Sequence, residues 1–159
     1  SRIEPDVDVG AGAVPFAVLI DDHEAVGPRG RGEQRRAGDG QRLDVIACDL
    51  HPLNNTRVLT YLTGPMGLSN EARQTWYCHW IAEGLGALET MLARDRQTGK
   101  FCHGDAPGLA DCCLVPQMAN ARRFKCDVAP YPTLLKIEGN CQALDAFQRA
   151  APDKQPDAE

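Results

Sequence analysis

The chain has 159 residues, a length that suits one hydrophobic core rather than two full domains. Apolar residues make up 43% and charged residues 25%, which is typical of a globular protein. The net charge of −5 argues against nucleic-acid binding, which needs a basic surface to displace phosphate counterions. The longest apolar run, residues 13–20, is too short to span a bilayer, and no signal peptide is visible. We therefore expect no membrane association and a cytoplasmic location.

The seven cysteines are odd in number and lack the spacing of a disulfide framework. We expect mostly buried thiols in a reducing compartment. Metal binding is the alternative, because Cys48 and His51 form a C-x-x-H and Cys78 precedes His79 directly. Structural zinc sites usually draw on paired ligands with C-x₂₋₄-C spacing, which the sequence lacks. We therefore expect no metal site.

The composition changes near residue 42. Residues 1–41 hold seven of the fifteen glycines, and residues 28–42 are rich in glycine and arginine with almost nothing apolar. Such a segment cannot bury enough apolar surface to offset its ordering entropy. We predict irregular or disordered backbone for residues 1–41, in which only residues 14–20 have a strand pattern.

From residue 42 onward the apolar residues recur at helical spacing. This pattern predicts an all-α bundle over residues 42–150, followed by a polar tail at 151–159. The first helix is expected over residues 42–62. We expect it to kink or break near His51, because Pro52 removes one hydrogen bond and clashes with the preceding turn.

The later helices have clearer ends. Ser69 is the expected N-cap of a second helix, whose apolar stripe covers residues 73–94. A third helix is predicted over 108–123, and Pro132 suits the first turn of a fourth. Residues 144–147 predict a short last helix.

Five stretches in this helical part resemble, in the same order, the C-terminal domain of the zeta-class glutathione transferases, which are maleylacetoacetate and maleylpyruvate isomerases. They are DVIACDLHPLNNTRVLTYL at 44–62, W-x-x-x-W at 76–80 followed by IAEGLGALE, FCHGDAPGLADCCLVPQMANARRF at 101–124, PYPTLLKIE at 130–138 and APDKQPDAE at 151–159. The resemblance implies the glutathione transferase C-terminal helical bundle, here preceded by an irregular segment.

The family places a complete thioredoxin-like domain before the helical one. Its glutathione-activating motif of serine and cysteine, and its Gln-Ser turn for the γ-glutamyl group, are not found in residues 1–41. We interpret these residues as a truncated or frame-shifted remnant of that domain; a genuinely divergent N-terminal arm is the alternative. No catalytic residue is identified, and we expect little or no activity from this chain alone.

The resemblance implies glutathione-dependent cis–trans isomerisation of maleylacetoacetate or maleylpyruvate, with a role in aromatic amino acid catabolism. Glutathione thiolate adds to the double bond, the resulting single bond rotates, and elimination restores the alkene as trans. By resemblance, Arg57 and Arg123 hold the carboxylates of the dicarboxylate substrate, a task that suits the planar guanidinium fork. A solvated helix arginine is the alternative for each, and we expect Arg122 to face solvent.

The glutathione-binding residues implied by the resemblance are His51, Asn55 and Thr56. His51 and Asn55 are four apart, so they share one face if the helix resumes after Pro52. Relatives often carry a leucine or a basic residue in place of Thr56. The alternative for His51 is a histidine that satisfies the broken backbone at the proline.

The family that the chain resembles has the pattern Gly-Asp-x-Pro-Thr-Leu-Ala-Asp at the start of the third helix, and its threonine and last aspartate make a capping box. By resemblance, Gly108 and Asp111 form this structural cap. Gly108 replaces the threonine here, so the box loses one side chain, whereas Asp111 can still accept from free N–H groups. We predict lower stability for this helix. Trp76 and Trp80, one turn apart, are expected in the core or at an interface.

A non-catalytic helical interaction module that keeps this fold is the alternative function. A thioredoxin-like domain encoded in frame upstream would favour the isomerase. The family forms homodimers, so the resemblance implies a homodimer for the intact protein. Surface that would pack against the first domain should favour self-association of this chain.

Overall fold

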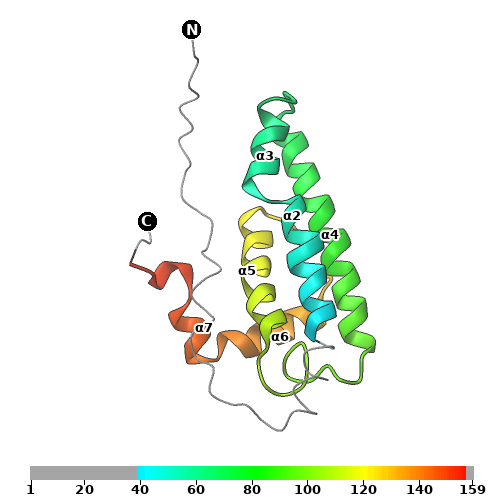
Figure 1. Ribbon diagram of the computed structural model, residues 1–159, viewed down its shortest axis with the longest axis vertical. Helices are drawn as coiled ribbons and strands as arrows, with labels where there is room; N and C mark the ends of the chain where they lie inside the picture. The colour runs from blue at the N-terminus through cyan, green and yellow to red at the C-terminus, as the bar shows by residue number, and fades with distance from the viewer. Residues whose placement is uncertain (1–38, 157–159) are drawn as a thin grey trace.

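The computed structural model describes residues 39–156 as a helical bundle (Figure 1). Residues 39–44 are helical and lead into the π-helical turn η2. The elements that follow are η2 (Val45–Leu50), α2 (His51–Leu53), α3 (Thr56–Thr63), α4 (Asn70–Arg94), α5 (Leu109–Arg123), α6 (Pro132–Gln142), α7 (Asp145–Arg149) and the 3₁₀-helix η3 (Pro152–Lys154). Residues 39–156 contain no strand, only one isolated bridge between Thr98 and Gly104. The predicted all-α fold is confirmed for this range.

The predicted boundary at residue 42 falls inside a helix, because residues 39–41 are already helical. The strand pattern at 14–20, and the rest of the segment up to residue 38, lie outside the described residues. So do residues 157–159 of the polar tail, whereas its earlier part contains η3.

The long helix α4 is the centre of the bundle. Figure 1 shows η2 and α2 running beside α4, with α5 next to them and α6 across one end. Both α4 and α5 contact η2, and both contact α6. The side chains that meet between these elements are fully buried and apolar: Ile81, Leu85, Leu88, Leu114, Met118 and Leu134. Gly84 allows the closest approach, since a Cβ atom there would lie 2.5 Å from Cδ1 of Leu50.

The helical run that contains Pro52 is irregular on both sides of His51. His51 donates its N–H to the carbonyl of Ile46, five residues back, so a π-helical turn precedes the proline. Pro52 is the second residue of α2 and directly follows this turn, in which the hydrogen bond spans five residues. The backbone leaves the helix at Asn54 and is extended at Asn55, which caps α3. The break therefore lies at residues 54–55, near His51 as predicted.

Predicted features of α4 are confirmed at both ends. Ser69 Oγ accepts a hydrogen bond from the N–H of Ala72 at 3.2 Å, and the helix ends at Arg94. Beyond it, the buried Arg42 forms an ion pair with Asp95. A hydrogen bond from the N–H of Gln97 is the largest cause that lowers the pKa of Asp95, and Arg42 lowers it further. The N-terminal helical segment is thus attached to the end of α4.

Helix α5 ends in a Schellman motif. Cys126 donates its N–H to the carbonyl of Ala121, and Lys125 donates to that of Arg122, both at 2.9 Å. Phe124 is the C-cap, and Lys125 adopts the left-handed conformation with φ of 56°. Glycine is the usual residue at this position because a Cβ atom disfavours positive φ.

Replacing Lys125 by glycine should therefore raise the free energy of unfolding by about 1 kcal/mol. Urea unfolding followed by far-UV circular dichroism measures the change. Lys125→Ala keeps the Cβ atom and is the matched control, with no comparable gain expected. Equal effects of the two substitutions would contradict the explanation.

The cysteines are not all free thiols. Cys78 of α4 and Cys126 form a disulfide with their Cα atoms 5.2 Å apart. The prediction was of mostly buried thiols, and it did not foresee this pair, because sequence spacing does not show which cysteines meet. Burial raises the pKa of the Cys113 thiol to about 11 and that of Cys141 to about 12. These two thiols are therefore protonated and unreactive near neutral pH.

Among residues 39–156, no three histidine, cysteine or acidic side chains are grouped as metal ligands would be. No helix in this range is both long and apolar enough to cross a membrane.

Candidate functional site

The junction between α2 and α3 carries four of the five predicted binding residues. Asn55 is the N-cap of α3, and its Oδ1 accepts the N–H of Arg57 at 3.1 Å. Thr56 and Arg57 follow in the first turn, and both are exposed. His51 is also exposed, but on the short helix before the break. His51 and Asn55 therefore do not share the face of one continuous helix, because the helix resumes for only one residue after Pro52.

Helix α4 holds this junction in place from the inside. Asn54 is buried, and its Nδ2 donates to the carbonyl of Tyr77 at 3.2 Å. Trp76 donates its indole N–H to the carbonyl of Leu53 at 3.1 Å. The two bonds satisfy the carbonyl of Tyr77 on α4 and that of Leu53 on α2, and they fix the point at which α3 begins. Sequence reasoning missed Asn54; its position between a proline break and a capping asparagine was the available signal.

The end of α5, which carries Arg123, meets the same part of α4. The ring of Phe124 stacks on that of Tyr77, with centroids 3.8 Å apart and planes 15° apart. Gln74 donates its side-chain amide to the carbonyl of Phe124. Burial raises the pKa of Tyr77 to about 12, and the nearby Arg123 opposes this rise. Tyr77 is therefore a neutral packing residue at physiological pH, not an acid or base.

Tyr77 thus joins the two segments that carry the predicted arginines. Its carbonyl binds Asn54 beside α3, and its ring packs against the residue that follows Arg123. Figure 1 shows the start of α3 and the end of α5 on the same side of the molecule, next to α4. Arg57 and Arg123 are both exposed there. Two exposed guanidinium groups suit the recognition of an anion with more than one carboxylate.

Arg122 is exposed, as predicted, and it also forms an ion pair with α6. Its Nη1 and Nη2 atoms each lie 2.5 Å from one carboxylate oxygen of Glu138 on α6. Glu138 is 2% exposed and also accepts a hydrogen bond from Gln142 at 3.2 Å. The hydrogen bond to Glu138 raises the pKa of Arg122 above its usual value. The neighbour of Arg123 therefore joins α5 to α6.

The cap at the start of α5 contains a contact that the sequence did not predict. Asp111 is fully buried and accepts the N–H of Gly108 at 2.8 Å and that of Cys102 at 2.9 Å. Asp39 supplies the acceptor that Gly108 lacks: its Oδ2 accepts the N–H of Leu109 at 2.9 Å. A carboxylate from the first described helix therefore does what an N-cap side chain would do.

The two tryptophans, which were predicted to lie in the core or at an interface, pack against each other on α4. Their rings lie 5.6 Å apart in a T-shaped arrangement, and both are half-buried. Trp80 also contacts the ring of the exposed His79. Trp76 supports the α2–α3 junction through its N–H, so it belongs to the scaffold of the candidate site.

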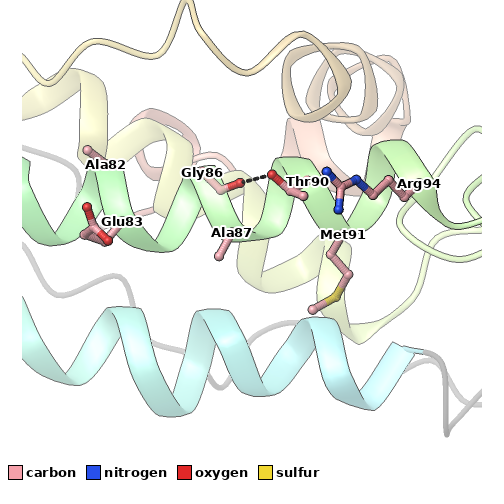
Figure 2. A pocket seen from close by; sticks show the side chains of 7 residues that line it. All are labelled: Ala82, Glu83, Gly86, Ala87, Thr90, Met91 and Arg94. Atoms are coloured by element: carbon pink, nitrogen blue, oxygen red, sulfur yellow. Dashed lines mark hydrogen bonds between the residues drawn. The ribbon is translucent and has the colours of Figure 1, made fainter.

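Shallow surface hollows lie away from the predicted arginines. Figure 2 shows one along α4, where Thr90 donates its hydroxyl to the carbonyl of Gly86 at 2.9 Å. It is lined by Ala82, Glu83, Gly86, Ala87, Thr90, Met91 and Arg94. A second hollow lies between the end of α4 and α6. Neither of these two hollows is lined by Arg57 or Arg123.

Comparison with known proteins assigns the family. No protein-family model matches the chain. A maleylpyruvate isomerase from a Ralstonia species is 46% identical over 114 residues, which cover 72% of this chain and 54% of that protein. The crystal structure of maleylpyruvate isomerase from Pseudomonas aeruginosa superposes with a TM-score of 0.76 at 57% identity, covering 80% of this chain and 66% of the other.

A holo maleylpyruvate isomerase, described as a bacterial zeta-class glutathione S-transferase, is 41% identical with a TM-score of 0.74. The match covers 85% of this chain and 61% of that one. The chain belongs to the zeta-class glutathione transferases. The maleylacetoacetate isomerase of Methylobacterium extorquens, solved with bound malonate and glutathione, is 39% identical with a TM-score of 0.76 and is matched over 80% of this chain and 59% of that one.

This zeta-class chain spans about half the length of the curated relatives it matches, 54% and 58% of the first two. The described bundle is the C-terminal helical part of the family fold. The predicted resemblance is therefore confirmed for the family and for this domain.

Proposed function

We propose that the chain takes part in glutathione-dependent cis–trans isomerisation of maleylacetoacetate or maleylpyruvate to the fumaryl product. The observation that carries the proposal is the position of Arg57 and Arg123. Both are exposed on segments that meet α4 at Tyr77. The solved maleylacetoacetate isomerase of Methylobacterium extorquens contains glutathione together with malonate, a small dicarboxylate.

The residues divide the work in this proposal. Arg57 and Arg123 bind the substrate carboxylates and stabilise the negative charge that forms when the thiolate adds. His51, Asn55 and Thr56, at the α2–α3 junction, bind glutathione in this proposal. Thr56 is the first residue of α3, where backbone N–H groups have no acceptor within the helix. No residue among those described is assigned to thiol activation.

Replacing Arg57 or Arg123 by alanine should weaken dicarboxylate binding about tenfold each, because each removes one charge-assisted contact to a partly solvated carboxylate. Malonate titration of the purified chain, followed by tryptophan fluorescence or calorimetry, measures the affinity. Arg149→Ala is the matched control, since Arg149 is an exposed arginine on α7 that pairs with Asp145. Unchanged affinity in both variants would overturn the assignment.

Turnover is tested separately, as loss of the cis-enone absorbance of maleylpyruvate with and without glutathione. We expect little or no turnover by the chain alone. Fusion to the thioredoxin-like domain of a relative should give glutathione-dependent turnover that falls in the arginine variants. If the fusion binds glutathione but stays inactive, the non-catalytic module becomes the better explanation.

We further propose that the intact protein is a cytoplasmic homodimer that serves aromatic amino acid catabolism. This extends the family assignment and the substrate class proposed above. Sedimentation velocity of the chain and of the fusion tests the dimer, and a monomeric fusion at micromolar concentration would contradict it.

A further inference from the structure

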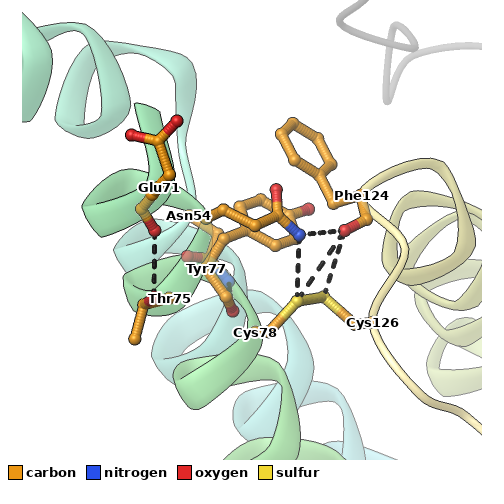
Figure 3. The surroundings of a disulfide bond; sticks show 8 residues. Asn54, Glu71, Thr75, Tyr77, Cys78, Phe124 and Cys126 are labelled. Atoms are coloured by element: carbon orange, nitrogen blue, oxygen red, sulfur yellow. Dashed lines mark hydrogen bonds between the residues drawn. A yellow bond between two sulfur atoms is a disulfide. The ribbon is translucent and has the colours of Figure 1, made fainter. Parts of the chain in front are cut away.

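The Cys78–Cys126 disulfide lies beside the segment that positions Arg123. Cys78 is on α4, directly after Tyr77, and Cys126 is the third residue after Arg123. Figure 3 shows both sulfur atoms next to the carbonyl oxygen of Phe124, at 3.7 and 3.8 Å. The cross-link thus fastens the end of α5 to α4 at the place where the candidate site is built.

Two other contacts hold the same segment. Tyr77 stacks on Phe124, and the side-chain amide of Gln74 donates to the Phe124 carbonyl and to the sulfur of Cys78, the latter at 3.2 Å. These contacts remain when the disulfide opens. Reduction should therefore loosen the end of α5 without unfolding the bundle.

The two sulfurs differ in their surroundings. Cys126 is 8% exposed and belongs to the core, whereas Cys78 is only partly buried on the surface of α4. Access decides which sulfur of a disulfide a small thiol attacks. Cys78 is therefore the point of entry for a low-molecular-weight thiol.

We propose that Cys78 and Cys126 form a thiol–disulfide exchange site for glutathione-class thiols, and that its redox state sets the position of Arg123. The role of Arg123 rests on the proposed function, whereas the exchange itself does not. With the disulfide closed, Arg123 is held for dicarboxylate binding. With it open, the segment from Arg123 to Cys126 moves more freely and binding weakens.

Glutathione, the thiol that the proposed function already uses, supplies the two electrons that reduce the disulfide. One glutathione thiolate attacks Cys78, forming a mixed disulfide and releasing Cys126 as a thiolate. A second glutathione thiolate attacks the glutathione sulfur of that mixed disulfide and releases Cys78. The two cysteine thiolates take up the two protons that the glutathione thiols lost. The protein disulfide gains two electrons, and two glutathione molecules become one glutathione disulfide; the reverse reaction closes the cross-link.

The first test counts thiols. The purified chain is equilibrated in buffers of varied ratio of glutathione to glutathione disulfide, quenched in acid and alkylated under denaturing conditions. Five labelled cysteines are expected in the closed form and seven in the open form. Peptide mapping should place the two additional labels on Cys78 and Cys126. Seven labels at every ratio, or five until the bundle unfolds, would overturn the proposal.

The second test reports on the segment and on Arg123. Hydrogen exchange at the N–H of Cys126, which bonds to Ala121 in the closed form, should become at least tenfold faster on reduction. Malonate should bind about threefold more weakly to the reduced chain. Cys126→Ser should behave like the reduced form under all conditions. Cys48→Ser, which changes an exposed cysteine outside the pair, should leave both responses unchanged.

The two readouts separate the two proposals. Faster exchange with unchanged malonate affinity would keep the exchange site and overturn its link to Arg123. Absence of malonate binding in every redox state would contradict the substrate assignment, while thiol counting would still decide the exchange. Unchanged exchange at Cys126 on reduction would overturn the loosening of the segment.

Discussion

Replacing Asp111 by alanine should lower the free energy of unfolding by about 4 kcal/mol, the largest effect expected of any single polar residue in the bundle. The side chain is fully buried, and its two oxygens accept from the backbone N–H groups of Gly108 and Cys102. Alanine leaves both donors without this acceptor, and the N–H of Cys102 is fully buried. The loop before α5 then loses its attachment to the helix.

Urea unfolding, read by far-UV circular dichroism, gives both the free energy and the m value. Asp105→Ala is the matched control, because Asp105 is an exposed residue of the same loop that accepts one backbone N–H, from Lys100 at 3.1 Å. The control should cost about 0.5 kcal/mol or less, since water replaces its bond. A loss below about 1 kcal/mol for Asp111→Ala at unchanged m would show that the buried network is not needed.

Asp111→Asn separates charge from hydrogen bonding. The amide oxygen can still accept one backbone N–H, but its NH₂ group would face the other donor. We expect a loss between those of the alanine variant and the wild-type chain. An asparagine variant as unstable as the alanine variant would mean that both accepting oxygens are required.

Helices with local signals were predictable from the sequence. The N-cap at Ser69, the end of α4 and the proline start of α6 depend on residues within a few positions of each other. Hydrophobic periodicity and capping rules act at that range. The break near Pro52 was predicted, but its form was not: a π-helical turn precedes the proline, and Asn55 caps a new helix. The π-helical turn and the cap both depend on which backbone N–H groups find acceptors.

Contacts between distant segments were not predictable in this way. Periodicity places Arg122 on the surface of α5, but only the packing of α6 brings Glu138 to it. The same holds for Cys78 and Cys126, which are 48 residues apart. Arg57 and Arg123 were named through the family resemblance, whereas Asn54 and Tyr77, which support them, became visible only in the structure.

Replacing Asp39 by alanine should lower the free energy of unfolding by about 2 kcal/mol, because a charged acceptor for backbone N–H groups is lost at a helix N-terminus. Asp39 Oδ2 lies 2.9 Å from the nitrogen of Leu109 and 3.5 Å from that of Ala110. It takes the position that a side chain at Gly108 would need, since a Cβ atom there would lie 2.5 Å from the same oxygen. The predicted weakness of the α5 cap is thus compensated by a residue from the first described helix.

A side chain at residue 108 and the Asp39 carboxylate would occupy the same space, so the two positions are interdependent. A double-mutant cycle measures this coupling. In the wild-type background Asp39→Ala removes the acceptor. In the Gly108→Thr background the threonine hydroxyl caps α5 and displaces the Asp39 carboxylate, so Asp39→Ala should then cost little. We expect a coupling energy of about 2 kcal/mol between the two sites. Additive effects would show that Asp39 does not act through the start of α5. Asp44→Ala changes an exposed aspartate of the same helical segment, and it should leave the cycle unaffected.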